Sequence, residues 1–282
     1  MKKRYSDNSG PAGQALQYLI LLLFSCLALF PILLVFFNSF KTRRAIFDSP
    51  LTLPGPETFS LKGYDTVLAR SNYLSYFGNS LIVTIISLAL ILLFGAMAAW
   101  ALSEYRFRGN RQLALYMALG IMIPIRLGTV SILRLCVSLH LVNTLAALVL
   151  VYTAQGLPLT IFIMQQFMSQ IPTGLKDAGR VDGASEYRIF TLILPMVRPA
   201  LATVAVFTMM PIWNDLWFPL ILAPSEKTKT LILGAQMFLG QFVTDWNAIL
   251  SALTLAIFPV VVLYVIFSRQ LISGLTAGSI KS

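Results

Sequence analysis

Two ionisable residues, Arg126 and Asp215, lie inside long apolar stretches of the sequence. A charge in the hydrocarbon core of a membrane is costly and usually faces the interior of a helix bundle or water. Counted at about 1.5 Å per residue from the start of their apolar segments, the two reach similar heights. One hypothesis is therefore that both face one polar cavity, paired or bridged by water, where a guanidinium donor and a carboxylate acceptor suit a solute rich in hydroxyl groups. The other is that Arg126 extends to the outer surface while Asp215 caps or hydrogen-bonds locally.

Two short polar runs accompany these charges. Trp213 and Asn214 immediately precede Asp215, and Asn79-Ser80 stand at the start of an earlier apolar run. Tryptophan commonly anchors a helix at the membrane interface, and asparagine commonly hydrogen-bonds between helices. For Asn79 we favour a helix cap, with a place on a substrate path as the alternative.

Motifs for covalent chemistry are absent from the sequence. It contains no G-x-x-x-x-G-K-[ST], no H-E-x-x-H and no G-x-S-x-G, and its single histidine is His140. Cys26 and Cys136 lie in apolar runs without metal-ligand spacing. No chain of acidic residues suggests a proton relay. We therefore expect no enzyme, no metal site and no cofactor in this chain.

The composition is that of a membrane protein. Of 282 residues, 57% are hydrophobic and 11% are charged, against about 25% charged in soluble domains, and the mean hydropathy is +0.78. The net charge of +10 is carried largely by residues at the ends of apolar runs. This placement indicates that the charges orient the chain in the membrane rather than bind nucleic acid. We predict an all-α polytopic membrane helix bundle in one domain, residues 1–282.

Six apolar runs predict six transmembrane helices. The first is too long for the apolar core of a signal peptide. Six spans place both termini on one side, and more Lys and Arg flank that side, which favours the cytoplasm although Lys41, Arg43 and Arg44 oppose it. The outer stretch 223–247 is then a contact for another protein or a solvated connector. The spans are 16–37, 81–102, 113–135 (containing Pro124, Arg126 and Arg134), 144–167, 200–222 and 249–267.

A polar segment, 171–199, interrupts the apolar pattern between the fourth and fifth spans. Its spacing predicts a helix, a turn broken at Gly183, and a second helix capped by Asp182. An ordinary covering loop is the alternative. One face of the first helix carries Leu175, Ala178, Gly179 and Asp182; the second carries Tyr187, Phe190 and Leu194 at helical spacing and ends at Pro195.

The same segment resembles the EAA motif of ABC-importer permeases. Asp177-Ala178-Gly179 stands where that motif has Glu-Ala-Ala, and Asp182-Gly183-Ala184, Phe190, Ile193 and Leu194-Pro195 match at the right offsets. Asp177 has a shorter reach than Glu, and Gly179 in place of Ala loosens the first helix by about 1 kcal/mol. The resemblance implies a coupling helix that docks on an ATP-binding subunit through Asp177, Ala178, Gly179, Asp182, Gly183, Ala184, Phe190, Leu194 and Pro195.

Two further runs are similar to MalG-type permeases of carbohydrate ABC importers. Trp213-Asn214-Asp215 resembles a run in their fifth span, which implies a substrate path with Asn79 and Arg126 beside it. The end of the chain, 273–281, is similar to a tail that reaches the ATPases, which implies contacts by Gly274, Thr276 and Gly278. A frayed end is the alternative.

The family resemblance implies a function and a set of partners. The chain would be a bacterial inner-membrane permease that imports a sugar by alternating access, with its termini in the cytoplasm. Its partners would be a second, MalF-like permease, two MalK-like ATP-binding subunits that hold ATP and Mg, and a periplasmic sugar-binding protein. A non-transporting membrane scaffold that docks partners through the helical hairpin is the alternative. Nucleic acid is not an expected partner.

Overall fold

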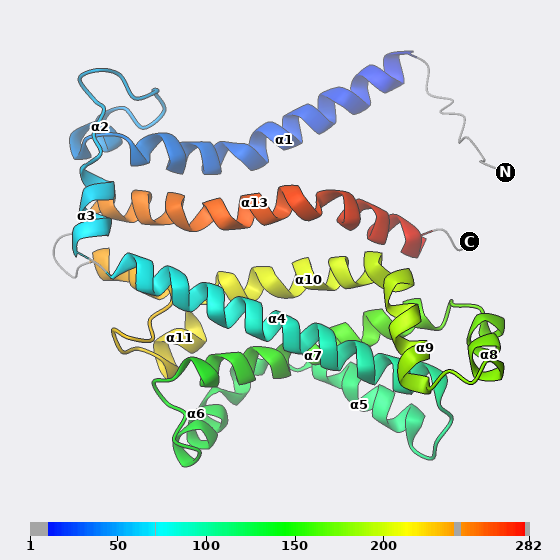
Figure 1. Cartoon of the computed structure of the whole chain (residues 1–282). Helices are drawn as coiled ribbons and strands as arrows, with labels where there is room; N and C mark the ends of the chain where they lie inside the picture. Colours follow the sequence, from blue (N-terminus) through cyan, green and yellow to red (C-terminus); the bar gives the residue numbers. More distant parts are fainter. Residues whose placement is uncertain (1–10, 71, 240–243, 280–282) are drawn as a thin grey trace. The chain divides into compact units, whose positions relative to one another are not determined.

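The computed structural model describes residues 11–70, 72–239 and 244–279, with side chains for all of these except 11, 12, 70 and 263–279. The regular elements of these residues are all helices (Figure 1). In chain order they are α1 (Pro11–Ser39), α2 (Arg43–Asp48), α3 (Lys62–Arg70), α4 (Tyr73–Glu104), α5 (Asn110–Met122), η1 (Ile125–Gly128), α6 (Thr129–Ser138), α7 (Leu145–Met168), α8 (Thr173–Val181), α9 (Glu186–Ile193), η2 (Leu194–Val197), α10 (Arg198–Trp213), α11 (Trp217–Leu222), α12 (Leu231–Ala235), η3 (Gln236–Phe238) and α13 (Trp246–Ser279).

The all-α membrane fold predicted from composition is confirmed. Four helical segments are long and apolar enough to cross a membrane, namely Gly13–Ser39, Tyr73–Glu104, Leu145–Met168 and Glu186–Trp213. The pair Asn110–Met122 and Ile125–Ser138 passes the same test together. The part of α13 whose side chains are described, Trp246–Val262, is a shorter apolar helix. Each of the six predicted spans therefore falls on helical residues.

The third span is not the continuous helix that was predicted. Its two halves, α5 and η1–α6, are bent by 88°. Pro124 lies at the break, and the residue before it, Ile123, has left the helical conformation with φ −86° and ψ 115°. The cause is the proline ring, which removes a backbone donor and disfavours the helical conformation of the preceding residue.

The fifth span also ends earlier than predicted, because α10 ends at Trp213 rather than continuing to 222. Asn214 and Asp215 separate it from α11. The Asp215 carboxylate accepts hydrogen bonds from the backbone N–H groups of Trp217 (3.2 Å) and Phe218 (3.1 Å), which belong to the first turn of α11. A side chain that satisfies those donors favours a new helix start at this point.

The described chain divides into two compact units, Met1–Arg70 with Phe238–Leu255, and Ser71–Met237 with Ala256–Ser282. In the first unit, polar contacts hold the segment after α1. Asn247 Nδ2 donates to the Lys41 carbonyl at 2.6 Å, and the Ser39 and Tyr64 hydroxyls lie 2.8 Å apart. Lys41 is itself fully buried, and its Nζ donates to the Ser49 carbonyl at 2.8 Å. Burial lowers the pKa of this amine.

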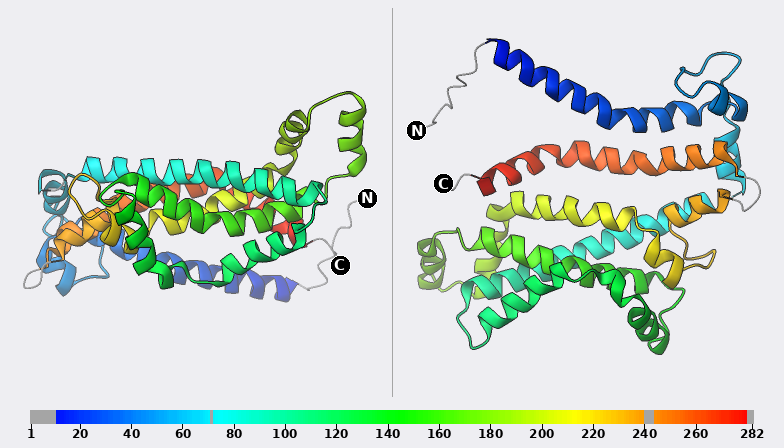
Figure 2. Two further views of the ribbon diagram at one scale, coloured as in Figure 1. Left: turned by 90° about the horizontal axis from the view of Figure 1, so that it is seen from below. Right: turned by 180° about the vertical axis from the view of Figure 1, so that it is seen from behind.

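The second unit is organised by the packing of α4 against α7, which run side by side in both views of Figure 2. Glycines allow this close approach. A Cβ on Gly95 would lie 2.3 Å from Thr160 Cγ2, and a Cβ on Gly156 would lie 2.5 Å from Ile91 Cδ1. The helices therefore meet through small residues, as membrane helices commonly do.

Two buried clusters extend this contact toward the two ends of α4. One joins α4 to α7, α10 and α11, and the other joins the later part of α4 to α7, α9 and α10. The first contains Ile91, Leu148, Tyr152, Phe218 and Leu222, and the second contains Trp100, Met164, Met168, Ile189 and Ile193.

We expect Gly95→Ala to destabilise the protein, because the added methyl group must displace Thr160 and overpacking costs about 1–3 kcal/mol. Gly78→Ala is the matched control. Gly78 lies on the same helix, a Cβ there meets no atom within 4 Å, and alanine favours the helix. Thermal unfolding of the purified protein in detergent would measure both. Equal melting temperatures for the two variants would contradict the close packing of α4 on α7.

Candidate functional site

The polar segment between α7 and α10 forms a helical hairpin, α8 followed by α9, at the end of the unit where α4 finishes (Figure 2). The turn after α8 is closed by two backbone hydrogen bonds, Ala184 N to Gly179 O (2.9 Å) and Gly183 N to Arg180 O (3.1 Å). Gly183 has a φ of +74°. This arrangement is a Schellman motif, which places a glycine in the left-handed region just after a helix. The predicted break at Gly183 is confirmed.

The predicted cap of the second helix is wrong. Ser185, rather than Asp182, is the N-cap of α9, and its Oγ accepts a hydrogen bond from Arg188 N at 3.3 Å. Asp182 instead ends α8, where its backbone N–H bonds to Ala178 O. The cap lies three residues later than predicted because Gly183 and Ala184 complete the Schellman turn before α9 can start.

The hairpin has a buried face and an exposed face, and they differ in part from the predicted ones. Ile189 and Ile193 are the buried residues of α9, whereas Tyr187 is 77% exposed. A Cβ on Gly179 would lie 3.3 Å from Ile189 Cγ1, so this glycine serves the packing of α8 on α9. Of the other predicted coupling residues, Asp177, Ala178, Asp182, Gly183 and Pro195 are exposed, and Ala184, Phe190 and Leu194 are half-buried.

A charged network, which the sequence reasoning missed, ties the hairpin to α4. Glu104, the last residue of α4, accepts hydrogen bonds from Lys176 Nζ at 2.6 Å and from Arg180 Nη2 at 2.5 Å. The Lys176 side chain is only 5% exposed, and its Nζ lies 5.5 Å from the centroid of the Trp100 ring. A buried ammonium group needs a paired carboxylate, so Glu104 determines where α8 can lie.

Arg180 extends the network across the hairpin turn. Its Nε donates to Glu186 Oε1 at 2.8 Å, and its Nη1 donates to Asp177 Oδ1 at 3.0 Å. These contacts, led by Glu186 and Glu104, raise the pKa of Arg180 above its ordinary value. Burial, aided by the nearby Glu186 carboxylate, raises the pKa of Tyr105. The available sequence signal was the spacing of Lys176 and Arg180, which places two cations on one side of α8.

The second candidate site is the polar pair inside the unit. Arg126 Nη2 lies 3.3 Å from Asp215 Oδ1, so the pairing hypothesis for these two residues is confirmed. The local alternative for Asp215 holds as well, because the same carboxylate starts α11. Arg126 belongs to η1, at the break of the third span, and Asp215 lies at the break of the fifth. The two interruptions of apolar helices thus meet at one ion pair.

Tyr152 of α7 is a further member of this site that the sequence did not reveal. Its hydroxyl donates to Asp215 Oδ2 at 2.9 Å, and its ring packs edge-on to Phe218. Asp215 is buried, and the exposed fraction of the Arg126 side chain is 66%. The pair therefore joins a buried, fully hydrogen-bonded carboxylate to an accessible guanidinium.

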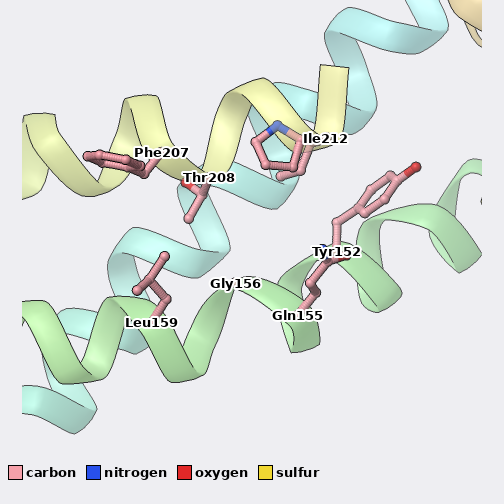
Figure 3. A pocket seen from close by; sticks show the side chains of 8 residues that line it. Tyr152, Gln155, Gly156, Leu159, Phe207, Thr208 and Ile212 are labelled. Atoms are coloured by element: carbon pink, nitrogen blue, oxygen red, sulfur yellow. The ribbon is translucent and has the colours of Figure 1, made fainter. Parts of the chain in front are cut away.

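Three neighbouring cavities open beside this pair, of about 230, 80 and 560 Å³. The first is lined by Arg126, Asp215, Tyr152 and Asn214 among others. The second lies between α7 and α10, where Figure 3 shows Thr208 and Ile212 opposite Gln155 and Leu159. Gln155, also missed in the sequence, lines all three cavities.

The other predicted path residues differ in their placement. Trp213 is buried and donates from Nε1 to the Ala256 carbonyl at 3.1 Å, so it anchors helices instead of lining the 230 Å³ cavity. Asn214 does line that cavity. Asn79 is not a helix cap, because α4 already begins at Tyr73; its Nδ2 donates to the carbonyls of Lys227 and Lys229 at 2.9 Å each.

The stretch after α11, which was predicted to lie on the outer side, is held by the first turns of α4. Besides Asn79, Ser80 Oγ accepts from Leu231 N at 2.8 Å, and the Tyr76 hydroxyl donates to Glu226. The hydrogen bond from Lys229, followed by that from Tyr76, lowers the pKa of Glu226. The stretch is therefore a structured loop on α4, with Gln236 exposed on it.

The comparisons with known proteins decide the family. Residues 91–275, which include the hairpin and the polar pair, match the family described as "Binding-protein-dependent transport system inner membrane component". The chain belongs to this family.

Family members with curated names cover nearly the whole chain. A putative ABC transporter permease protein, ORF2, of Caldicellulosiruptor sp. is 34% identical over 94% of this chain and 96% of its own length. The diacetylchitobiose uptake system permease NgcG of Streptomyces coelicolor is 31% identical over 99% of this chain and 92% of its own. The arabinooligosaccharides transport system permease AraQ of Halalkalibacterium halodurans is 32% identical over 90% and 92%.

A solved structure supports the fold of this inner-membrane component. A chain of a bacterial ABC transporter involved in the import of the acidic polysaccharide alginate superposes with a TM-score of 0.77. The superposition covers 94% of this chain and 99% of that one at 20% identity, so it shows the fold alone. The chain is thus a multi-pass inner-membrane permease of the ABC-importer type.

The predicted tail contacts of this permease stay predictions. Gly274, Thr276 and Gly278 fall on the last turns of α13, outside the residues whose side chains the structure describes. Their backbone continues helix α13 to Ser279. Helix α13 is 34 residues long, which exceeds the roughly 20 residues that a bilayer requires.

We expect Glu104→Gln to release the hairpin from α4, because it leaves the buried Lys176 without its carboxylate. Breaking a buried pair in this way costs about 3 kcal/mol or more. Limited trypsin digestion of the purified permease should then cut the hairpin several-fold faster. Asp182→Asn is the matched control, since it removes an acidic group of the same hairpin that forms no ion pair with the described residues. Equal digestion rates for the two variants would contradict the anchoring role of Glu104.

Proposed function

We propose that this chain is one of two permease subunits of an ATP-driven importer that moves a sugar or oligosaccharide from the periplasm to the cytoplasm. The names of the family relatives, which refer to diacetylchitobiose and arabinooligosaccharides, support this substrate class. The alternative, a non-transporting scaffold, is disfavoured, because those relatives are named as permeases and the chain has a polar cavity lined by Arg126 and Asp215.

The observation that carries the proposal is the α8–α9 hairpin. It projects from the helical unit, presents Leu175, Val181 and Tyr187 to solvent, and is bound to α4 by Glu104. An exposed apolar face on a rigidly anchored hairpin suits a groove on another protein. In our proposal the hairpin docks on a MalK-like ATP-binding subunit. Motion of that subunit then reaches α4 through the ion pairs.

The remaining partners follow from this assignment. A second, MalF-like permease completes the translocation path, and two MalK-like subunits bind ATP and Mg and hydrolyse the nucleotide. A periplasmic sugar-binding protein delivers the substrate to the outer loop. The chain itself holds no cofactor and performs no covalent step. Alternating access arises when closure of the ATPases moves the coupling hairpins and opens the path outward.

The topology is part of the same proposal. With the hairpin in the cytoplasm, both termini are cytoplasmic and the loop held by Asn79 and Ser80 faces the periplasm. The excess of Lys and Arg near the hairpin side agrees with this orientation.

We expect Gly183→Val to uncouple ATP hydrolysis from sugar uptake while the protein still inserts in the membrane. A β-branched residue resists a φ of +74°, at a cost of about 1–2 kcal/mol or more, so the turn must change and α8 must reorient on α9. Uptake in proteoliposomes, divided by the ATPase rate of the same preparation, measures the coupling.

Two other variants make this test specific. Gly183→Asn should retain coupling, because asparagine tolerates the left-handed region. Gly174→Val should also retain it, because Gly174 lies on α8 without a positive φ and in open space. Full coupling in Gly183→Val, or equal loss in all three variants, would contradict the role of the turn.

We expect the outer loop to contact the binding protein during turnover. A cysteine at Gln236, carrying a photoreactive maleimide in a background of Cys26→Ser and Cys136→Ala, should crosslink to it. A cysteine at Asp182 in the hairpin should crosslink to the ATP-binding subunit instead. Labelling of Gln236→Cys from the cytoplasmic side alone would overturn the proposed topology.

A further inference from the structure

The hydrogen bonds at Asp215 show which polar groups of the cavity are already occupied and which are available to a ligand. A carboxylate offers about four lone-pair positions. At Asp215 four donors occupy them: Arg126 and Trp217 N on Oδ1, Tyr152 and Phe218 N on Oδ2. The side chain is also buried. A ligand that enters the cavity therefore finds no free acceptor on this carboxylate.

Arg126, in contrast, has most of its hydrogen-bond donors available. Among the described residues its guanidinium donates to Asp215 alone, through a single contact at 3.3 Å. A guanidinium has five N–H donors in a planar fork, so most of them stay available. Its side chain is 66% exposed and lines the 230 Å³ cavity. The ion pair holds the guanidinium in one place without using its donor capacity.

Gln155 is the next polar group along the same surface. It projects from α7 one turn from Tyr152 and forms no side-chain hydrogen bond with the described residues (Figure 3). It lines the cavity at Arg126, the cavity between α7 and α10, and the 560 Å³ cavity along α5 and α7. Among the described residues, it is the one residue common to the three linings.

We propose that Arg126 and Gln155 bind the transported sugar directly, that Asp215 acts only by positioning Arg126, and that the site favours an uncharged sugar. The inference rests on the proposed transport function and assigns the roles within it. The guanidinium donates to ring and hydroxyl oxygens, and the amide both donates and accepts.

The zero net charge of the cavity lining is the reason why we infer an uncharged sugar. Of the side chains that the structure describes, Arg126 and Asp215 are the only charged ones that line the three cavities, and their charges cancel. The rest of the lining is largely apolar, including Leu159, Phe207 and Ile212. A carboxylate on the ligand would give this setting a net charge of −1, which is costly at membrane depth.

The test uses the complete importer, with its partner permease, ATP-binding subunits and binding protein, in proteoliposomes. The uncharged probes are maltotriose, diacetylchitobiose and arabinotriose, and the acidic probe is trigalacturonate. We expect uptake of at least one uncharged probe and none of the acidic one. Arg126→Gln and Gln155→Leu should each raise the KM for that probe about tenfold, as loss of one charged or well-placed hydrogen bond implies.

The positioning role of Asp215 has its own readout. Asp215→Asn alone should raise KM, but in the Arg126→Gln background it should cause no further increase, because its effect passes through Arg126. Tyr152→Phe, which removes one donor to Asp215 and keeps the ring in the core, replaces it if Asp215→Asn lowers the yield of assembled importer. It should show the same dependence on Arg126.

Matched controls and contrary outcomes complete the design. Arg134→Gln, on α6 outside the cavity lining, and Gln166→Leu, on α7 three turns beyond Gln155, should leave KM unchanged. Unchanged KM in Arg126→Gln and Gln155→Leu, or a further increase from Asp215→Asn in the Arg126→Gln background, would overturn this inference alone. So would preferential uptake of trigalacturonate. If no probe is transported, the proposed function itself fails, and this inference with it.

Discussion

The arrangement of the cytoplasm-facing hairpin in our proposal depends on one carboxylate, Glu104 at the end of α4. Apolar contacts through Ile189 and Ile193 hold α9 against the unit, but such contacts are non-directional and tolerate sliding. The buried ammonium of Lys176 does not allow such sliding, because it is stable there only beside the Glu104 carboxylate. Arg180 shares the same carboxylate and joins both helices of the hairpin. One residue of a membrane helix therefore sets the position of the whole hairpin.

Helix α4 connects this hairpin to the opposite side of the unit. Its first turns hold the outer loop through Tyr76, Asn79 and Ser80, its middle packs on α7, and its last residue holds α8. With 32 residues it is about 48 Å long at 1.5 Å per residue, which is longer than the roughly 30 Å of a bilayer core. The close glycine contacts with α7 make it a rigid connection between two surfaces to which partners are proposed to bind.

The polar interior follows from the requirement that every backbone group in a membrane be satisfied. The apolar helices α5 and α10 are both interrupted, and an interruption releases N–H and C=O groups that lipid cannot satisfy. At the end of α10, the Asp215 carboxylate accepts the freed donors of α11. Arg126 sits at the other interruption and neutralises that carboxylate. The carboxylate thus satisfies the donors freed at one break, the guanidinium at the other break neutralises it, and a donor-rich cavity is the consequence.

The sequence by itself determined the class of fold, the helical spans and the turn at Gly183, and it offered the pairing of Arg126 with Asp215 as one of two hypotheses. Each of these rests on local rules: apolar run length, the freedom of glycine at positive φ, and the cost of charge in lipid. Even the break at Pro124 was visible as a disturbance of the third span. Only the tertiary structure decided that Ser185 caps α9, that Glu104 meets Lys176, and that Tyr152 and Gln155 flank the ion pair. Residues 104 and 176, or 152 and 215, are brought together by the packing of separate helices, and no local pattern along one helix records which face its neighbour will cover.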